Sequence, residues 1–416
     1  MSVNITSEIG KIEGVIIHTP GSEVENMTPQ NAERALYSDI LNLSVAGREY
    51  SSFNKILEKF TKVYQVTDLL SEVIKNDEAK TNLIENICKN ENMLDLREQL
   101  IDLNPKQLSK VLIEGLPSVN NNLTKYLSGS RYSLEPLHNF FFTRDASMTV
   151  RNKVLIAKMS SKVREREAMI MESIFNYHPE ITAETVSPVK SKFYNNKITI
   201  EGGDVLIPRE DILLIGVGAR TTSQGVDFIL ERVKENGERR HIIIQELPLK
   251  PESFIHLDMV FTFVDKDKCL IYEPVIKNNH NLHTIHIVVD NGKVESITEK
   301  KDIFEVLSEL GMDLKPINCG GTSDLWIQER EQWHSGANLF ALAPGQVIGY
   351  GRNERTIEEL NKHGFDVINS EDVFSGKVLP EDYKNFVITL PGSELARGGG
   401  GCRCMTMPVL RKEVDW

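Results

Sequence analysis

The sequence is poor in cysteine. Its 416 residues include only Cys88, Cys269, Cys319, Cys402 and Cys404. Cysteines so few and so scattered cannot form the disulfide framework that is typical of small secreted proteins. At least one of them is therefore free to act as a nucleophile.

Long apolar runs and an excess of positive charge are also missing. The longest apolar stretches, such as the one through Leu213, Leu214 and Ile215, are far too short to span a membrane, and the N-terminus lacks a signal region. The 48 Lys and Arg residues are outnumbered by 60 Asp and Glu residues, which gives a net charge of −12. This balance argues against nucleic-acid binding. We expect a cytoplasmic protein with neither a membrane nor a nucleic acid as its partner.

The pattern of apolar residues divides the chain into two parts. From Asp68 to about Lys125 it is helical, and Asn104-Pro105 supplies an N-cap and a first-turn proline for one helix. Elsewhere, β-like runs such as KITI, VLIP and HIII alternate with turns and single helices. We expect an α/β catalytic domain formed by residues 1–67 and 128–416, into which residues 68–127 are inserted as a helical domain.

Residues that could carry chemistry recur along the α/β part. Asp145, the pair Glu201 and Asp204, and the pair His256 and Asp258 follow each other at steps of about 55 residues. The local sequences do not match one another, so chance spacing is an open alternative. If the period is real, similar modules each send one loop or strand end toward a shared centre.

The segment FIHLDMVFTFV reads as one β-strand, because apolar residues alternate along it. On such a strand His256 and Asp258 share a face, where they could serve as a proton carrier and its charge partner. A buried structural pair is the competing interpretation, and it is favoured for an isolated HxD.

Two further carboxylate motifs are weak when taken singly. IEGGD places Glu201 and Asp204 around two glycines, which predicts a hairpin turn. FTRD places Asp145 beside Arg144, and this pattern is more typical of a strand end with a solvated ion pair than of a site.

Four glycines, Gly398 to Gly401, lead directly into Cys402 and Cys404. Consecutive glycines let a backbone approach a ligand closely. No second Cys or Cys/His pair lies close in sequence to complete a four-ligand metal set, and the sequence has neither HExxH nor a glycine fingerprint for nucleotides. We therefore expect one of the two cysteines to be a nucleophile.

One cysteine, one histidine and several carboxylates suit a guanidinium substrate. A guanidinium is planar, permanently cationic and carries five N–H donors, so its site needs carboxylates set in its plane. A thiolate could attack the central carbon while a histidine protonates the departing amine, and the two steps complete a covalent hydrolysis.

Six motifs in order resemble the arginine deiminase family of the guanidino-group-modifying (pentein) superfamily. They run from about Ile16 to Arg411 and read VIIHTPGSEVENMTP, LHNFFFTRD, IEGGD, FIHLDMVFTFVD, EREQW and RCMTMP. The resemblance implies an α/β propeller of five ββαβ modules with an inserted helical bundle, and a homo-oligomer. It also implies hydrolysis of L-arginine to L-citrulline and ammonia without a metal or organic cofactor.

The resemblance further implies which residues carry out the reaction. Cys404, and not Cys402, matches the nucleophile. His256 matches the general acid/base, and Glu201 matches the acid that supports this histidine.

The substrate-binding residues are implied in the same way. Asp145 and Asp258 match the carboxylates that bind the guanidinium, and Arg164 and Arg220 match arginines that bind the α-carboxylate. Further residues expected to contact the substrate are Asn139, Phe142 and Asp204.

Two alternatives stay open at this point. One is a related hydrolase that acts on citrulline, agmatine or a methylated arginine, and the other is a non-catalytic relative that binds arginine. Arg164 and Arg220 favour an α-amino acid, because agmatine has no α-carboxylate for them to pair with. A protein that only binds arginine has no need of a thiol. The leading prediction is an arginine deiminase that works through a covalent Cys-thiouronium intermediate.

Overall fold

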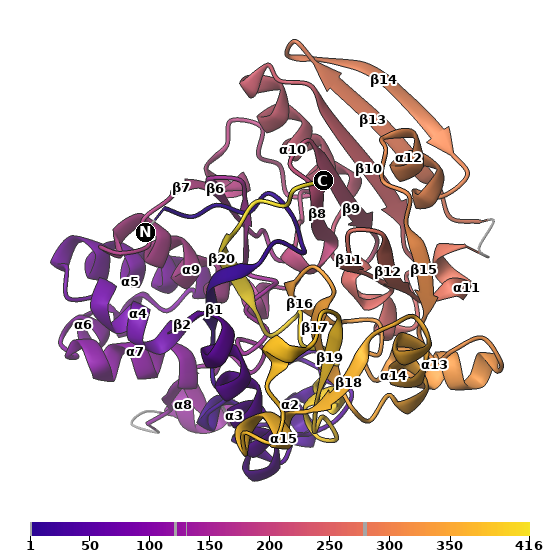
Figure 1. Ribbon diagram of the computed structural model, residues 1–416. Coiled ribbons are helices and arrows are strands. Elements are labelled where there is room, and N and C mark those ends of the chain that lie inside the picture. The colour runs from indigo at the N-terminus through magenta and orange to yellow at the C-terminus, as the bar shows by residue number, and fades with distance from the viewer. Residues whose placement is uncertain (1, 120–122, 130, 278–280) are drawn as a thin grey trace.

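The computed structural model describes residues 2–119, 123–129, 131–277 and 281–416. Five of its sheets contain the same unit, in which an antiparallel pair of strands is followed by a helix and by a strand parallel to the inner strand of the pair. The first unit joins the two ends of the chain, because β20 (Met407–Arg411) pairs with β1 (Ile12–Ile17), and α3 (Leu43–Phe60) then leads to β2 (Lys62–Gln65). Figure 1 shows β1 and β20 side by side.

The next two units follow along the chain. The second consists of β5 (Ser147–Val150), β6 (Lys153–Ile156), α9 (Glu165–Tyr177) and β7 (Glu184–Val186). The third consists of β8 (Val205–Arg209), β9 (Ile212–Val217), α10 (Ser223–Asn236) and β10 (Arg240–Glu246). Two antiparallel strands, β13 (Thr284–Asp290) and β14 (Lys293–Lys300), extend the third sheet.

The last two units carry additional elements. The fourth consists of β11 (Phe261–Asp265), β12 (Lys268–Ile271), α11 (Glu273–Ile276), α12 (Ile303–Glu309) and β15 (Lys315–Asn318). The fifth consists of β16 (Phe340–Ala343), β17 (Gln346–Tyr350), α14 (Glu354–Lys362), β18 (Asp366–Asn369), α15 (Ser370–Phe374) and β19 (Phe386–Leu390), with β19 between β17 and β18. The helix α13 (Leu325–Trp333) connects the two units.

The segment predicted to be helical does form helices. They are α4 (Val66–Val73), α5 (Asp77–Glu91), α6 (Arg97–Ile101), α7 (Pro105–Glu114) and α8 (Leu123–Ser128), and β3 (Leu116–Pro117) and β4 (Tyr132–Leu134) form a small sheet beside them. The apolar side chains of α4, α5, α6 and α7 share one core with α9, β6 and β8. In Figure 1 these helices lie together on the side of α9. The short helices α1 (Ser22–Glu25) and α2 (Pro29–Ala32) precede α3.

Two local predictions are wrong. Strand β11 begins only at Phe261, because Leu257–Met259 form a turn of 3-10 helix that His256 precedes. Gly202–Asp204 also form a 3-10 turn and not a hairpin. In both places local hydrogen bonds replace the ladder of a sheet: Met259 donates its backbone N–H to the carbonyl of His256, and Asp204 donates to that of Glu201, each at 3.1 Å.

The search for a membrane-spanning helix was negative. Within the described residues, no helix is both long and apolar enough to cross a bilayer.

The start of α7 offers a test of the local structure. The side chain of Asn104 accepts the backbone N–H of Gln107 at 3.0 Å, so Asn104→Ala leaves that amide without its partner. We expect α7 to lose about 1 kcal/mol of local stability, and its amide hydrogens to exchange about fivefold faster. Peptide-resolved hydrogen exchange measures this. Asn104→Ser retains a capping oxygen and should exchange almost as the unchanged protein does, and equal acceleration in both variants would contradict the cap.

Candidate active site

One cavity, of about 340 Å³, brings together most of the residues singled out in the sequence. Seven of those ten line it, and they are Asn139, Phe142, Asp145, Arg164, Arg220, His256 and Cys404. The other three, Glu201, Asp204 and Asp258, are fully buried and do not line the cavity. The residues predicted to meet therefore form two layers, one that faces the cavity and one that lies behind it.

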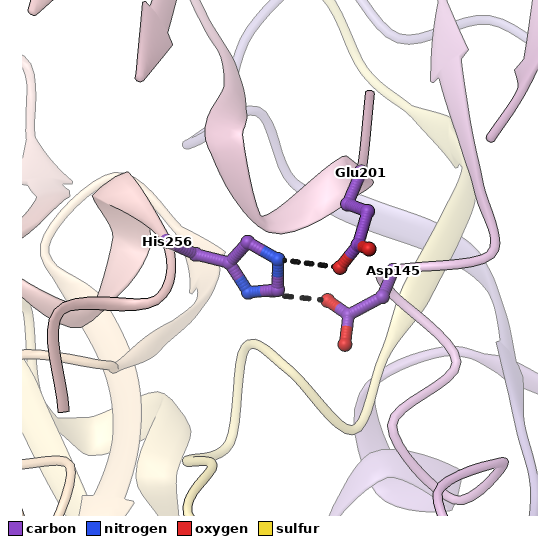
Figure 2. Close-up of side chains that lie close together, drawn as sticks. All are labelled: Asp145, Glu201 and His256. Carbon is purple, nitrogen blue, oxygen red and sulfur yellow. Dashed lines mark hydrogen bonds and ion pairs between the residues drawn. The ribbon is translucent and has the colours of Figure 1, made fainter. Parts of the chain in front are cut away.

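His256 lies between two carboxylates, as Figure 2 shows. Its Nε2 is 2.9 Å from Oε2 of Glu201, and its Nδ1 is 3.7 Å from Oδ1 of Asp145. Burial alone would lower the pKa of His256, but the charge of Asp145 and the hydrogen bond to Glu201 outweigh it and raise this pKa to about 9. The imidazole is therefore cationic at neutral pH and can act as a proton donor.

Glu201 holds its position through further hydrogen bonds. Its Oε1 accepts the backbone N–H and the hydroxyl of Ser160, both at 2.9 Å. Burial opposes ionisation, but the hydrogen bond and charge of His256 lower the pKa of Glu201 to about 2. The two glycines that follow are required by close packing, because a Cβ on Gly202 would lie 2.0 Å from the carbonyl oxygen of Arg144, and one on Gly203 would lie 2.5 Å from the His256 ring.

Asp145 has one oxygen bound and one open. Its Oδ2 accepts a hydrogen bond from Nη1 of Arg164 at 2.7 Å, whereas Oδ1 has no hydrogen-bond partner among the described residues. The carboxylate is almost fully buried. Because an unpaired buried carboxylate oxygen is costly, Oδ1 is suited to accept hydrogen bonds from a cationic ligand in the cavity.

The two arginines expected to bind an α-carboxylate differ in their surroundings. Arg164 is buried, and its guanidinium donates to Asp145 and, at 2.8 Å, to Glu167, so its strongest donors are already engaged. Arg220 is half-buried at the cavity, and its Nη1 contacts only the hydroxyl of Ser160, at 3.3 Å, among the described side chains. Arg220 is thus the better placed of the two to bind an anionic group.

Asp258 lies behind the thiol and not in the cavity. Its Oδ2 accepts a hydrogen bond from Nη1 of Arg403 at 2.7 Å and is 3.8 Å from Sγ of Cys404. Arg403 also donates to both carboxylate oxygens of Glu8, at 3.1 Å each. Burial raises the pKa of Asp258, although Arg403 and His256 oppose the shift.

Cys404 reaches the cavity, whereas Cys402 does not. Asn338 holds the cysteine loop, because its Oδ1 accepts the backbone N–H groups of Arg403 and Cys404 at 2.9 and 3.2 Å. Burial, together with the charges of Asp258 and Asp145, raises the pKa of the Cys404 thiol well above its usual range. The thiol is consequently protonated at neutral pH.

Asp204 supports the backbone at the histidine. Its Oδ1 accepts the backbone N–H of Leu257 at 2.9 Å, in the turn that directly follows His256. Burial raises the pKa of Asp204 to about 7, because the opposing charge of His256 only partly offsets it. Its position therefore suits the orientation of His256 better than contact with a ligand.

Asp145, Glu201 and His256 could also hold a metal ion, since their ligand atoms lie within 4.8 Å of one another. A metal-binding imidazole must be neutral, however, and this imidazole has its pKa raised to about 9. The ion pair is the better account of the cluster.

Several residues of the site carried no signal in the sequence. Ser160, Asn338 and Glu8 are isolated polar residues outside any motif, and only the fold brings them to the histidine and the cysteine loop. Glu167 is different, because its spacing of three residues from Arg164 is typical of an ion pair on a helix.

Comparison with known proteins gives a consistent result. The arginine deiminase family model matches residues 33–411. Proteins named arginine deiminase from Listeria innocua serovar 6a and Bacillus cytotoxicus are 33% and 32% identical to this chain. The first alignment covers 98% of both chains, and the second covers 99% of both.

Solved structures with the same fold are much more distant in sequence. An amidinotransferase from the saxitoxin pathway of Microseira wollei has a TM-score of 0.56 at 13% identity, over 99% of this chain and 98% of its own. The N-terminal domain of an arginine dihydrolase from cyanobacteria has a TM-score of 0.52 at 14% identity, over 96% and 97%. They show the α/β pentein fold. The family model and the full-length relatives together show that this chain belongs to the arginine deiminase family.

Proposed function

We propose that the protein hydrolyses L-arginine to L-citrulline and ammonia through a covalent intermediate on Cys404. The observation that carries this proposal is the meeting of a thiol, a cationic imidazole and an open carboxylate oxygen in one cavity, at Cys404, His256 and Asp145. A guanidinium needs all three, because it is a cation, it is attacked at carbon, and its amine leaves only when protonated.

The substrate is held at its two ends. Oδ1 of Asp145 accepts hydrogen bonds from the guanidinium, and Arg220 pairs with the α-carboxylate. Asn139 and Phe142 also line the cavity. Arg164 acts mainly by fixing Asp145, with its charge helping to retain the carboxylate of the substrate.

Binding of the cation prepares the nucleophile. Burial and the charges of two carboxylates hold the Cys404 thiol neutral, and a guanidinium beside the carboxylates compensates their charge, so the pKa of the thiol falls when the substrate enters. The thiol then loses its proton to solvent, and the thiolate attacks the guanidinium carbon. His256 donates its proton to one amino group, the C–N bond breaks, and ammonia leaves.

Water completes the reaction. The imidazole of His256, now neutral, takes a proton from a water molecule, and the resulting hydroxide attacks the thiouronium carbon. The C–S bond breaks and the thiolate leaves, while the new hydroxyl group loses its proton to become the carbonyl of citrulline. Uptake of one proton by the thiolate restores the resting thiol as citrulline is released. Through its hydrogen bond to Nε2, Glu201 stabilises the imidazolium before it donates its proton and again after it takes a proton from water.

The finer architecture belongs to the same proposal. The repetition of one ββαβ unit in five sheets supports a five-bladed propeller, and a first unit built from both chain ends would close such a ring. We propose the helices between β2 and β4 as an inserted domain that covers the second unit. A homo-oligomer, a cytoplasmic location and the absence of nucleic-acid partners stay predictions of the sequence.

Incubation with L-arginine tests the proposed reaction directly. The unchanged protein should yield citrulline and ammonia in equal amounts. Cys404→Ala should lose turnover by roughly 10⁴-fold or more, since no other cysteine lines the cavity among the described residues. Cys402→Ala is the matched control and should keep most of its turnover. Absence of citrulline would overturn the proposal, and parallel assays with citrulline, agmatine and methylated arginines would then identify a related hydrolase.

Substrate choice depends on Arg220. Replacement of this residue by Ala removes a charge-assisted pair with the α-carboxylate, so KM for L-arginine should rise by about 10- to 100-fold. Agmatine, which lacks that carboxylate, serves as the internal control, and kcat/KM for it should change little. Steady-state kinetics with both substrates measures the difference. An equal loss for both would assign Arg220 a structural role.

A further inference from the structure

A second cavity, of about 590 Å³, lies between α5 and α9 and is larger than the one that holds Cys404. Figure 1 shows these two helices next to each other. Lys158 and Glu165 lie in its wall, and the segment between them also carries Ser160 and Arg164 of the candidate active site. Nothing in the proposed reaction uses this cavity.

Apart from Oε1 of Glu172, which forms an ion pair with Lys190, two polar groups of the wall have no hydrogen-bond partner among the described residues. The hydroxyl of Ser173, on α9, belongs to a side chain that is only 7% exposed. The second group is the amide nitrogen Nδ2 of Asn90, at the end of α5. An unpaired polar group in a buried position is costly, and such groups in native proteins usually have a partner. Both groups can donate a hydrogen bond, so a ligand with an acceptor atom inside the cavity would give them partners.

The wall also presents carboxamides along one face of a helix. Asn82, Asn86 and Asn90 follow each other at intervals of four residues on α5, and all three line the cavity. Asn82 donates from Nδ2 to the hydroxyl of Tyr177 on α9, at 3.2 Å. A row of this kind suits a ligand with an amide or ureido group, which can both donate and accept.

Charges of both signs occur at the same wall. Glu172 pairs with Lys190 at 3.0 Å, and Lys158 pairs with Glu165. The side chain of Lys190 is largely exposed, whereas that of Glu172 is mostly buried, so the lysine can move away and leave the carboxylate for a ligand ammonium group. The arrangement matches a zwitterion, with one group of each sign.

We propose that this cavity is a second binding site, and that it takes a small zwitterionic α-amino acid with a carboxamide or ureido side chain. The side-chain carbonyl accepts hydrogen bonds from Nδ2 of Asn90 and Oγ of Ser173. The α-ammonium group binds Glu172, and the α-carboxylate binds Lys190. Glutamine and citrulline both carry these groups. Because glutamine is neither substrate nor product of the proposed reaction, its binding can be tested independently of turnover.

Isothermal titration of Cys404→Ala protein with L-glutamine tests the site without turnover. L-Norvaline, which has no side-chain carbonyl, should bind about tenfold more weakly or worse. Adding Ser173→Ala to the Cys404→Ala protein should weaken glutamine binding by about tenfold, and Asn90→Leu should do the same. The melting temperature of the ligand-free protein should not fall with Ser173→Ala, because the hydroxyl has no protein partner to lose.

The matched control is Ser370→Ala, since the hydroxyl of Ser370 is also buried and unpaired but lies on α15, outside this cavity. It should leave glutamine affinity unchanged. Equal glutamine affinity with Ser173 or Asn90 replaced, norvaline as tight as glutamine, or no binding at all would each overturn the proposal. Any of these results would leave the hydrolysis of arginine by the unchanged protein untouched.

Discussion

Buried carboxylates can coexist at the centre of this protein only because buried cations compensate them. An isolated ionised carboxylate is very costly in a protein interior, and even a paired one is stable only when hydrogen bonds satisfy its oxygens. The pairs are Asp145 with Arg164, Glu201 with His256, and Asp258 with Arg403. Among the described residues, no cation bonds directly to Asp204, and burial raises its pKa to about 7. The positions of several distant chain segments thus depend on charge matching at one place.

In the proposed reaction, the same charge balance keeps the thiol unreactive until the substrate binds. The carboxylates hold His256 in its cationic form, and burial together with two carboxylates holds the Cys404 thiol in its neutral form. Both states are the reverse of a neutral imidazole beside a reactive thiolate. A cationic guanidinium reverses the balance at the thiol because it adds positive charge next to Asp145. In the proposed reaction, activation of the nucleophile is therefore coupled to binding of a cationic substrate.

The sequence was a good guide to which residues meet and a poor guide to how they are held. The segment FIHLDMVFTFV contains a 3-10 turn before its strand. In this turn, Met259 donates its backbone N–H to the carbonyl of His256, and Leu257 donates to the distant side chain of Asp204. The alternation of apolar residues reveals neither bond. The helix after Asn104 was predicted correctly, since its cap and its proline are local signals. Asn338 could not have been found, because it acts on Cys404 across 66 residues.

The most direct test of the charge balance is the titration of the His256 ring, followed by ¹⁵N NMR and assigned with a His256→Asn variant. A raised pKa means that the proton stays on the ring as the pH rises and is lost only near the raised value. The account predicts a midpoint near pH 9, and Glu201→Gln should move it to lower pH, because the carboxylate that stabilises the cation is gone. A midpoint near the ordinary value of 6.5 in the unchanged protein, or one that Glu201→Gln leaves in place, would contradict it.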